Sequence, residues 1–235
     1  MMRLVMVFLF ALVLFLRAAE PIAGPSSGPK VPPPGITIPE EDRAALAAGV
    51  KAFGDEIEAL RVALREKPSL LELLPDAQVF HKAVDWAVRY GEFYRTNEAQ
   101  IALQLLEQGR ERAKALRSGN APWTTATGLV VRGYVSRIDG SIQPYGLVVP
   151  PSFTPKTTPK HRLDLWLHGR DDRLTELKFI DERQKRPGEF TPADAFVLHP
   201  YGRYCNAFKF AGEVDVLEAQ EHVRKHYPID ENRVA

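Results

Sequence analysis

The stretch HRLDLWLHGRDDRLTELKFI, residues 161–180, contains a strand, a loop and the start of a helix. Leucines alternate with other residues over 161–167, which predicts a strand. A helix is expected over roughly residues 174–184. The loop between them begins at His168-Gly169. A loop in this position exposes backbone N–H groups at the carboxyl edge of a sheet, where α/β folds bind their ligands.

Further strands are expected on both sides of this stretch. Residues 129–138 and 141–149 are rich in β-forming residues, and Asp139-Gly140 between them is a strong signal for a two-residue hairpin turn. Residues 195–198 form a short, wholly apolar run, which is typical of a buried parallel strand.

The end of the sequence extends the same pattern. A helix is expected over residues 213–227, and residues 232–235 read as the start of another strand. Strands that alternate with helices predict an α/β fold, with the hairpin at an antiparallel edge of the sheet and parallel strands beyond it. Because the sequence stops as this strand begins, the sheet is expected to be incomplete.

The first half of the chain has a helical pattern. Apolar residues between 46 and 64 recur at spacings of four and three, and two more helices are expected within a helical region over residues 40–120. Their apolar stripes, which include Trp86 and Tyr90, are explained by core packing. Residues 20–39 are rich in Pro, Gly and Ser, which predicts an extended linker. Residues 121–235 are predicted to form the α/β domain.

The N-terminus has the features of an export signal. A basic start is followed by an apolar run over residues 4–16 and by Ala18-Ala19, so residues 1–19 are predicted to be a cleaved signal peptide. The run is shorter than the ~20 residues that span a bilayer; an uncleaved anchor or a buried helix is the alternative. The mature chain is expected in the periplasm or outside the cell, with no stable membrane anchor.

Composition argues against several classes of function. A formal charge of +1 argues against a nucleic-acid binder, and a single cysteine, Cys205, excludes an intrachain disulfide and a Cys-rich metal site. His222 and His226 lie four residues apart, but Val223 stands where a zinc-protease helix has glutamate, and the sequence suggests no third ligand. No metal and no cofactor are therefore expected.

Three segments occur in order at sensible spacing: SRIDGSIQPYGLVVP (136–150), LDLWLHGRDDRLTELKFI (163–180) and HPYGRYCNAFKFAGEVDVLEAQEHVRKHYPIDENRV (199–234). Together they resemble the α/β-hydrolase superfamily, specifically exported prolyl-oligopeptidase-like peptidases and esterases with a helical N-terminal region. The resemblance implies that the last strand leads into a Gly-x-Ser-x-Gly turn carrying the nucleophile, with an acid and a histidine after it. None of the three is present, so the chain as given is expected to be inactive.

The resemblance also implies an oxyanion hole. Gly169 and Arg170 match the loop that supplies it, through their backbone amides. His168, Asp171 and Asp172 adjoin this loop and are candidate pocket-lining residues. The alternative for the aspartates is a favourable position beside a helix start, and His168 is read mainly as a residue that stabilises the turn.

A second loop follows the strand at 195–198 and is expected at the same sheet edge. Tyr201, Arg203 and Asn206 either line the pocket there or pack within an ordinary loop. Cys205 is interpreted as structural, because no histidine partner is placed beside it. Helix-end electrostatics is expected to explain Glu213 and Asp215.

Two functions fit these observations. The first is the N-terminal part of a secreted serine hydrolase that acts on a small ester or peptide through an acyl-enzyme. The second is an exported, non-catalytic binding or interaction protein built on helices and a partial sheet. The second leaves an exposed edge on the last strand, which proteins normally cover, so the first is favoured.

Overall fold

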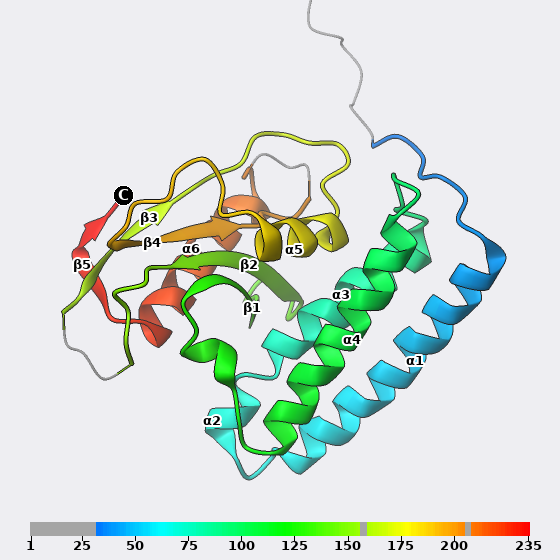
Figure 1. Cartoon of the computed structure of the whole chain (residues 1–235), viewed down its shortest axis with the longest axis horizontal. Helices are drawn as coiled ribbons and strands as arrows, with labels where there is room; N and C mark the ends of the chain where they lie inside the picture. Colours follow the sequence, from blue (N-terminus) through cyan, green and yellow to red (C-terminus); the bar gives the residue numbers. More distant parts are fainter. Residues whose placement is uncertain (1–31, 156–158, 205–207) are drawn as a thin grey trace, which may run out of the picture. The chain divides into compact units, whose positions relative to one another are not determined.

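A layer of helices precedes a five-stranded sheet in the computed structural model, which describes residues 32–155, 159–204 and 208–235 (Figure 1). The helices are α1 (Glu40–Ala63), α2 (Pro68–Leu71), α3 (Pro75–Tyr90), α4 (Glu98–Arg117), α5 (Glu176–Lys185) and α6 (Ala211–His226). The strands are β1 (Gly128–Val135), β2 (Ile142–Val149), β3 (His161–Leu165), β4 (Ala195–Pro200) and β5 (Ile229–Val234). The predicted signal peptide, residues 1–19, and the linker residues before 32 lie outside the described residues.

The sheet is mixed, with the strand order β1-β2-β4-β3-β5. β2 pairs antiparallel with β1 and with β4, whereas β3 pairs parallel with β4 and with β5. This confirms the predicted α/β class, with an antiparallel hairpin at one edge and parallel strands beyond it. β5 lies at the other edge, and on its outer side no strand from the described ranges pairs with it.

Helices cover both faces of the sheet because of how the strands are connected. α5 connects β3 to its neighbour β4, which lies on the β2 side of β3. α6 connects β4 to β5, which lies two positions away in the opposite direction across the sheet. Since such crossovers are right-handed, reversing the direction puts the two helices on opposite faces. A Cβ at Gly146 of β2 would lie 2.7 Å from Arg183 of α5, while the neighbouring Tyr145 hydroxyl lies 2.9 Å from His222 Nδ1 of α6.

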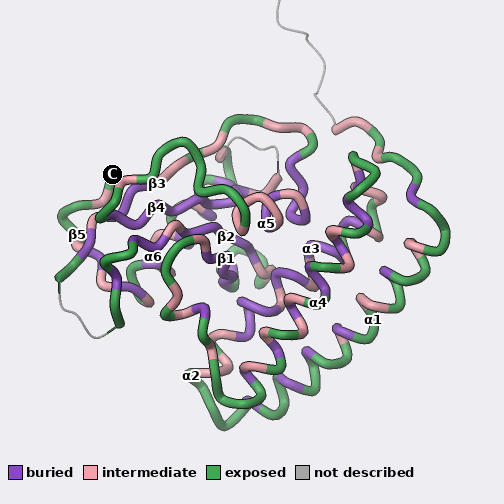
Figure 2. The backbone as a smooth tube through the Cα atoms, in the orientation of Figure 1, coloured by how far each residue is buried: buried purple, intermediate pink, exposed green. Residues whose placement is uncertain are grey.

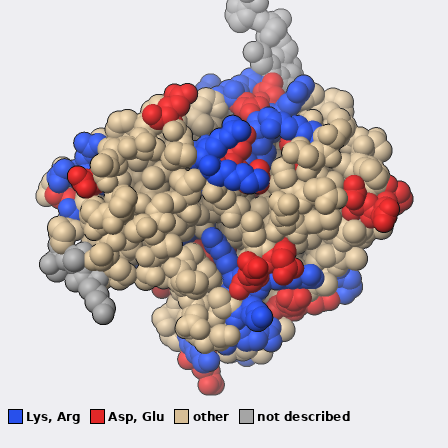
Figure 3. Space-filling model, in the orientation of Figure 1, with Lys and Arg blue, Asp and Glu red and all other residues tan. Residues whose placement is uncertain are grey.

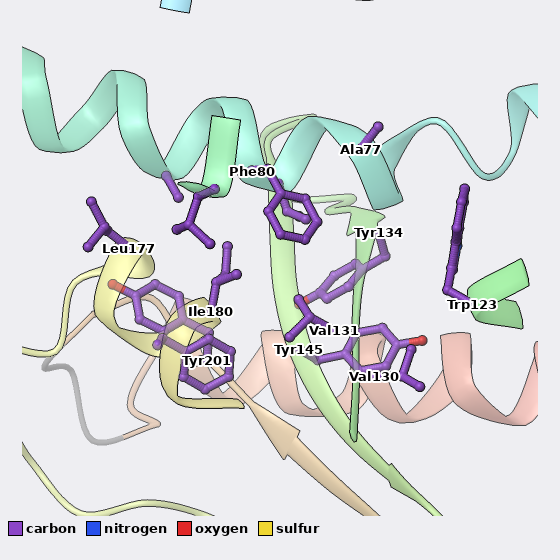
Figure 4. Packing of buried hydrophobic residues seen from close by; sticks show 14 of the residues in the cluster. Ala77, Phe80, Trp123, Val130, Val131, Tyr134, Tyr145, Leu177, Ile180 and Tyr201 are labelled. Atoms are coloured by element: carbon purple, nitrogen blue, oxygen red, sulfur yellow. The ribbon is translucent and has the colours of Figure 1, made fainter. Parts of the chain in front are cut away.

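α3 joins the helical layer to the same sheet face as α5. A Cβ at Gly133 of β1 would lie 2.4 Å from the carbonyl oxygen of Pro75, so only glycine allows the first turn of α3 to come this close. Figure 4 shows buried side chains between α3 and the sheet, and Tyr134 and Tyr145 on the side of α6. α1 and α4 pack against α3, and the outer side of α1 is exposed (Figure 2).

A buried ion pair also joins α3 to β1. Asp76 accepts hydrogen bonds from Arg132 Nη2 (2.9 Å), from the Gly133 amide (2.8 Å) and from Trp123 Nε1 (2.8 Å). The side chains of Asp76 and Arg132 are each 1% exposed. Arg112 donates to the carbonyl oxygens of Asp76 and Val131, so the helical layer and the sheet share one polar centre as well as one apolar core.

The predicted two-residue turn at Asp139-Gly140 is wrong, although the hairpin itself is present. β1 ends at Val135, and Ser136 and Ser141 then close a longer loop through the bond from Ser136 N to Ser141 O (2.8 Å). Asp139 Oδ1 accepts from the Ser141 amide (3.0 Å), and Gly140 takes a φ of +70°. These side-chain bonds end the strands before the turn.

Side chains of both charges are mixed on the surface of the protein (Figure 3). On the face drawn in Figure 3, Lys and Arg side chains lie beside Asp and Glu side chains, with wide uncharged areas between them. Among the described residues, no helix combines the length and the hydropathy needed to cross a membrane.

Candidate functional site

The carboxyl ends of β3 and β4 lie side by side at one edge of the sheet. The chain leaves β3 for α5 on one face and leaves β4 for α6 on the other. In α/β sheets this reversal opens a crevice at the strand ends, and ligands bind there. The loops that follow β3 and β4 begin at this edge, and they contain the predicted site residues that the structure describes.

Charged residues hold the loop after β3. Asp171 accepts hydrogen bonds from the Arg173 amide (2.9 Å) and from Lys178 Nζ (2.6 Å), while Arg170 Nε donates to Asp172 Oδ1 (2.9 Å). Partial burial by itself raises the pKa of Asp171, but the bonds from Lys178 and the Arg173 amide bring that pKa below its ordinary value. Both aspartates therefore form bonds that fix the loop conformation.

His168 ties the two loops together. Its Nδ1 lies 2.8 Å from the Gly169 carbonyl oxygen, and its Nε2 lies 2.9 Å from the carbonyl oxygen of Tyr201, at the end of β4. The ring also packs on Phe208, with 4.7 Å between the ring centroids. Carbonyl oxygens only accept, and a neutral imidazole has one N–H, so the neutral ring donates to one of the two at a time.

The backbone at Gly169 is open. The residue is exposed, its φ lies outside the left-handed region, and a Cβ there would meet nothing within 4 Å. Neither conformation nor crowding therefore requires glycine. Its amide donates to no acceptor in the described part of the chain, which leaves one N–H at the sheet edge for an anionic oxygen.

The loop after β4 has a strained backbone. Four of its described non-glycine residues have φ between +53° and +70°: Arg203, Tyr204, Phe208 and Phe210. L-residues disfavour this region, and such strain persists where the surroundings hold it, often at functional sites. The Tyr204 hydroxyl donates to the Asp172 carbonyl oxygen (3.1 Å), a second link between the two loops.

Arg203 anchors the same loop. Its guanidinium donates to Ser136 Oγ (2.7 Å), to Asp139 Oδ2 (2.7 Å) and to Asp215 Oδ1 (2.9 Å). The sequence predicts that helix-end electrostatics alone explains Asp215. Its side chain is only 1% exposed and forms an ion pair with Arg203 of the loop, so that explanation is incomplete. Cys205 and the predicted pocket residue Asn206 lie outside the described residues.

A pocket of about 340 Å³ lies beside the loop after β4. It is lined by Ala83, Trp86, Tyr90, Glu92, Gln143, Glu176, Tyr201, Arg203 and Tyr204. Two of these, Tyr201 and Arg203, are predicted pocket residues. The other lining residues carry no functional signal in the sequence, because an acidic residue in the first turn of α5 is explained by helix electrostatics and an aromatic stripe on α3 is explained by core packing.

The aromatic residues of this pocket correct the prediction of core packing. Trp86 is 40% exposed and Tyr90 is 62% exposed, so both lie at the outer end of the α3 stripe. Their rings meet edge to face, with 5.9 Å between the centroids. They form a wall of the pocket, and the exposure of two adjacent large aromatic side chains is itself typical of binding surfaces.

His222 and His226 have other partners than a metal. The rings lie 4.1 Å apart, Tyr145 OH lies 2.9 Å from His222 Nδ1, and His226 Nδ1 lies 2.8 Å from the His222 carbonyl oxygen. Burial lowers the pKa of His222 to about 3, so the ring is neutral at pH 7. Within the described ranges, no three His, Cys, Asp or Glu residues gather as a metal site would need.

Comparison with known proteins assigns no family. No family model, no curated protein and no solved structure matches this chain. Function has to be inferred from the sheet topology, the two loops and the pocket.

Proposed function

We propose that this chain forms the first half of an α/β-hydrolase catalytic domain, in a secreted serine hydrolase that acts on small esters or peptides. The observation that carries the proposal is the sheet: order β1-β2-β4-β3-β5, with β2 alone antiparallel. The first five strands of an α/β-hydrolase sheet have this order and these directions. The resemblance of residues 136–150, 163–180 and 199–234 supports the same family.

The position of the two strand ends supports the proposed chemistry. In this fold one oxyanion-hole amide comes from the loop after the third strand, and the nucleophile follows the fifth. Here β5 is the parallel neighbour of β3, and the Leu165 amide donates to the Ala235 carbonyl oxygen (2.8 Å). Residues after Ala235 would therefore continue from beside the end of β3, the strand that leads into the loop containing Gly169.

The proposed reaction divides into two acyl transfers. A serine after β5 would attack the substrate carbonyl carbon, and its proton would pass through a histidine to the leaving alcohol or amine. Water would then attack the acyl-enzyme and release the acid. In both steps the amides of Gly169 and Arg170 would donate to the negative oxygen of the tetrahedral intermediate. His168, Asp171 and Asp172 would hold these amides in place.

The direct test is the coding sequence beyond the codon for Ala235. The proposal expects an open frame with Gly-x-Ser-x-Gly within about ten residues, followed by an acid and a histidine. The whole protein should then react with a fluorophosphonate, and replacing that serine by alanine should abolish labelling. A stop codon directly after Ala235 would contradict the proposal and favour the non-catalytic binding protein.

A matched pair of variants tests the role of Gly169 in the whole protein. Proline has no N–H, so Gly169→Pro should lower kcat by about 10²–10³, the loss typical of a missing oxyanion donor. Gly169→Ala keeps the amide, and its Cβ meets nothing within 4 Å, so it should retain most activity. Equal activity in the two variants would exclude an oxyanion role for this amide.

Export is part of the same proposal. N-terminal sequencing of the protein from the culture medium or periplasm should find a start near residue 20. Recovery of the uncleaved chain from the cytoplasm would contradict it.

A further inference from the structure

Two residues that line the pocket beside the β4 loop, Glu176 and Gln143, each have a buried acceptor without a donor among the described residues. Glu176 Oε1 accepts from Lys82 Nζ (2.5 Å), whereas Glu176 Oε2 is buried and has no hydrogen-bond partner among the described residues. Gln143 Oε1 is likewise buried and unpartnered, although its Nε2 donates to Ser141 Oγ (2.7 Å). The Glu176 side chain is 5% exposed and Gln143 is 3% exposed. Buried acceptors in a native protein almost always have a donor, so these two indicate one from outside the chain.

The charges around the pocket favour a cation. Two cations, Lys82 and Arg203, lie among four carboxylates: Glu92, Glu176, Asp139 and Asp215. Burial raises the pKa of Glu92, and the charge of Glu176 raises it further. When these groups are ionised, the pocket has an excess of negative charge that a bound cation would offset.

The outer part of the pocket suits an apolar body. Trp86 and Tyr90 present two perpendicular rings, and Ala83 lies beside them in the lining. Lys82 Nζ already lies 4.4 Å from the centroid of the Trp86 ring. Aromatic faces attract cations as well as apolar groups, so this wall fits an amine whose carbon skeleton is apolar.

We propose that this pocket binds an organic primary ammonium ion. Its N–H groups donate to Glu176 Oε2 and Gln143 Oε1, and its apolar body lies against Trp86 and Tyr90. A quaternary ammonium has no N–H and leaves both acceptors unpaired. The volume of about 340 Å³ is that of a small-molecule site. The proposal stands on the pocket alone and does not depend on hydrolase activity.

Isothermal titration calorimetry of the full chain with 2-phenylethylamine tests the proposal near pH 7. We expect saturable binding at one site. The neutral 2-phenylethanol and the N–H-free trimethyl(2-phenylethyl)ammonium should each bind at least about tenfold more weakly. No binding of the amine, or equal affinity for the amine and the alcohol, would overturn the proposal. Tighter binding of the trimethyl compound would also overturn it, because that ligand cannot donate to either acceptor.

Three variants locate the site. Glu176→Gln should weaken 2-phenylethylamine binding by about tenfold or more, because it removes the charge and presents an amide where the acceptor stood. Tyr90→Ala should weaken it by about twofold to fivefold, and this exposed residue can be replaced without disturbing the core. Glu66→Gln, at an exposed glutamate outside the pocket lining, should leave affinity unchanged.

Circular dichroism checks that each variant is folded. If Glu176→Gln does not fold, Tyr90→Ala and the three ligands still decide the outcome. A folded Glu176→Gln variant with unchanged affinity would contradict the proposal.

Discussion

Two buried carboxylates link separate elements of the fold, Asp76 joining α3 to β1 and Glu176 joining α5 to α3, and they differ in how completely they are bonded. Both oxygens of Asp76 have donors, from Arg132, from the Gly133 amide and from Trp123. Glu176 has a donor on one oxygen only, Lys82. The first carboxylate is satisfied by the protein itself, whereas the second, on a residue that lines a pocket, keeps one acceptor without a donor among the described residues.

The pKa directions follow this difference. Burial by itself raises the pKa of Asp76, but the charge and hydrogen bonds of Arg132 hold it below its ordinary value. Burial also raises the pKa of Glu176, and there the single partner Lys82 does not reverse the effect. Both oxygens of Asp76 are bonded, although Arg132 Nη1 beside it is buried without a partner among the described residues. A buried carboxylate with one unpaired oxygen, such as Glu176, is costly unless another partner completes its bonding. The comparison therefore separates a structural carboxylate from one available for binding.

The largest expected effect is at Asp76, whose two carboxylate oxygens both have donors. Asp76→Asn should lower the free energy of unfolding by about 3–5 kcal/mol, because the positive charge of Arg132 is then buried without a counter-charge. Urea denaturation measures it. Asp55→Asn, at an exposed carboxylate of α1, is the control and should change stability by less than about 0.5 kcal/mol. Similar losses in the two variants would remove the structural role of Asp76.

Glu176→Gln should cost less. The variant keeps an oxygen that accepts from Lys82 and loses one charge-assisted bond, so we expect a loss of about 1–2 kcal/mol in the same urea experiment. A loss equal to that of Asp76→Asn would contradict the comparison, since both carboxylates would then be structural to the same degree.

The two variants should also respond to pH in opposite directions. The pKa of Asp76 is lowered on folding, so its ionised carboxylate stabilises the protein at pH values above the unfolded pKa of 3.8. This contribution is lost as pH falls through the folded pKa. The pKa of Glu176 is raised on folding, so its contribution to stability is fully present below the unfolded pKa of 4.5. This contribution is lost as pH rises through the folded pKa.

The destabilisation by Asp76→Asn should therefore shrink as pH falls below the unfolded pKa of 3.8, whereas that by Glu176→Gln should grow as pH falls towards the unfolded pKa of 4.5. Urea unfolding of the wild type and both variants on either side of these pKa values measures both changes. Parallel pH profiles would contradict the assigned directions.

The smallest effect is expected at the other unpartnered acceptor. Gln143→Met has nearly the same volume and removes an oxygen that bonds to nothing in the described structure, so stability should change by less than about 1 kcal/mol despite the lost bond to Ser141. Affinity for 2-phenylethylamine should nevertheless fall. Unchanged affinity would leave Glu176 as the acceptor and exclude Gln143.

Local periodicity made much of the fold predictable. The helix faces, the hairpin strands and the short apolar strand at 195–198 are patterns within a few residues, and each is present in the structure. The hairpin turn was not predictable in the same way, because Asp139 and Ser136 bond to Arg203, more than sixty residues away.

The sites depend even more on distant partners. The Lys82–Glu176 pair spans 94 positions and the Asp76–Arg132 pair spans 56, so nothing in the local sequence distinguishes these carboxylates from others at helix starts. Trp86 and Tyr90 continue an apolar stripe, and only the packing of α3 shows that the stripe extends past the core into solvent. The loop residues His168, Tyr201 and Arg203 were predictable because strand ends share an edge.

A crystal structure of the full chain with 2-phenylethylamine shows directly whether the pocket binds an ammonium ion. We expect the ammonium nitrogen within hydrogen-bond distance, about 2.7–3.2 Å, of Glu176 Oε2, and the phenyl ring against Trp86 or Tyr90. An amine bound elsewhere, or one whose nitrogen points to solvent and donates nothing to Glu176 Oε2, would contradict the proposed ammonium site.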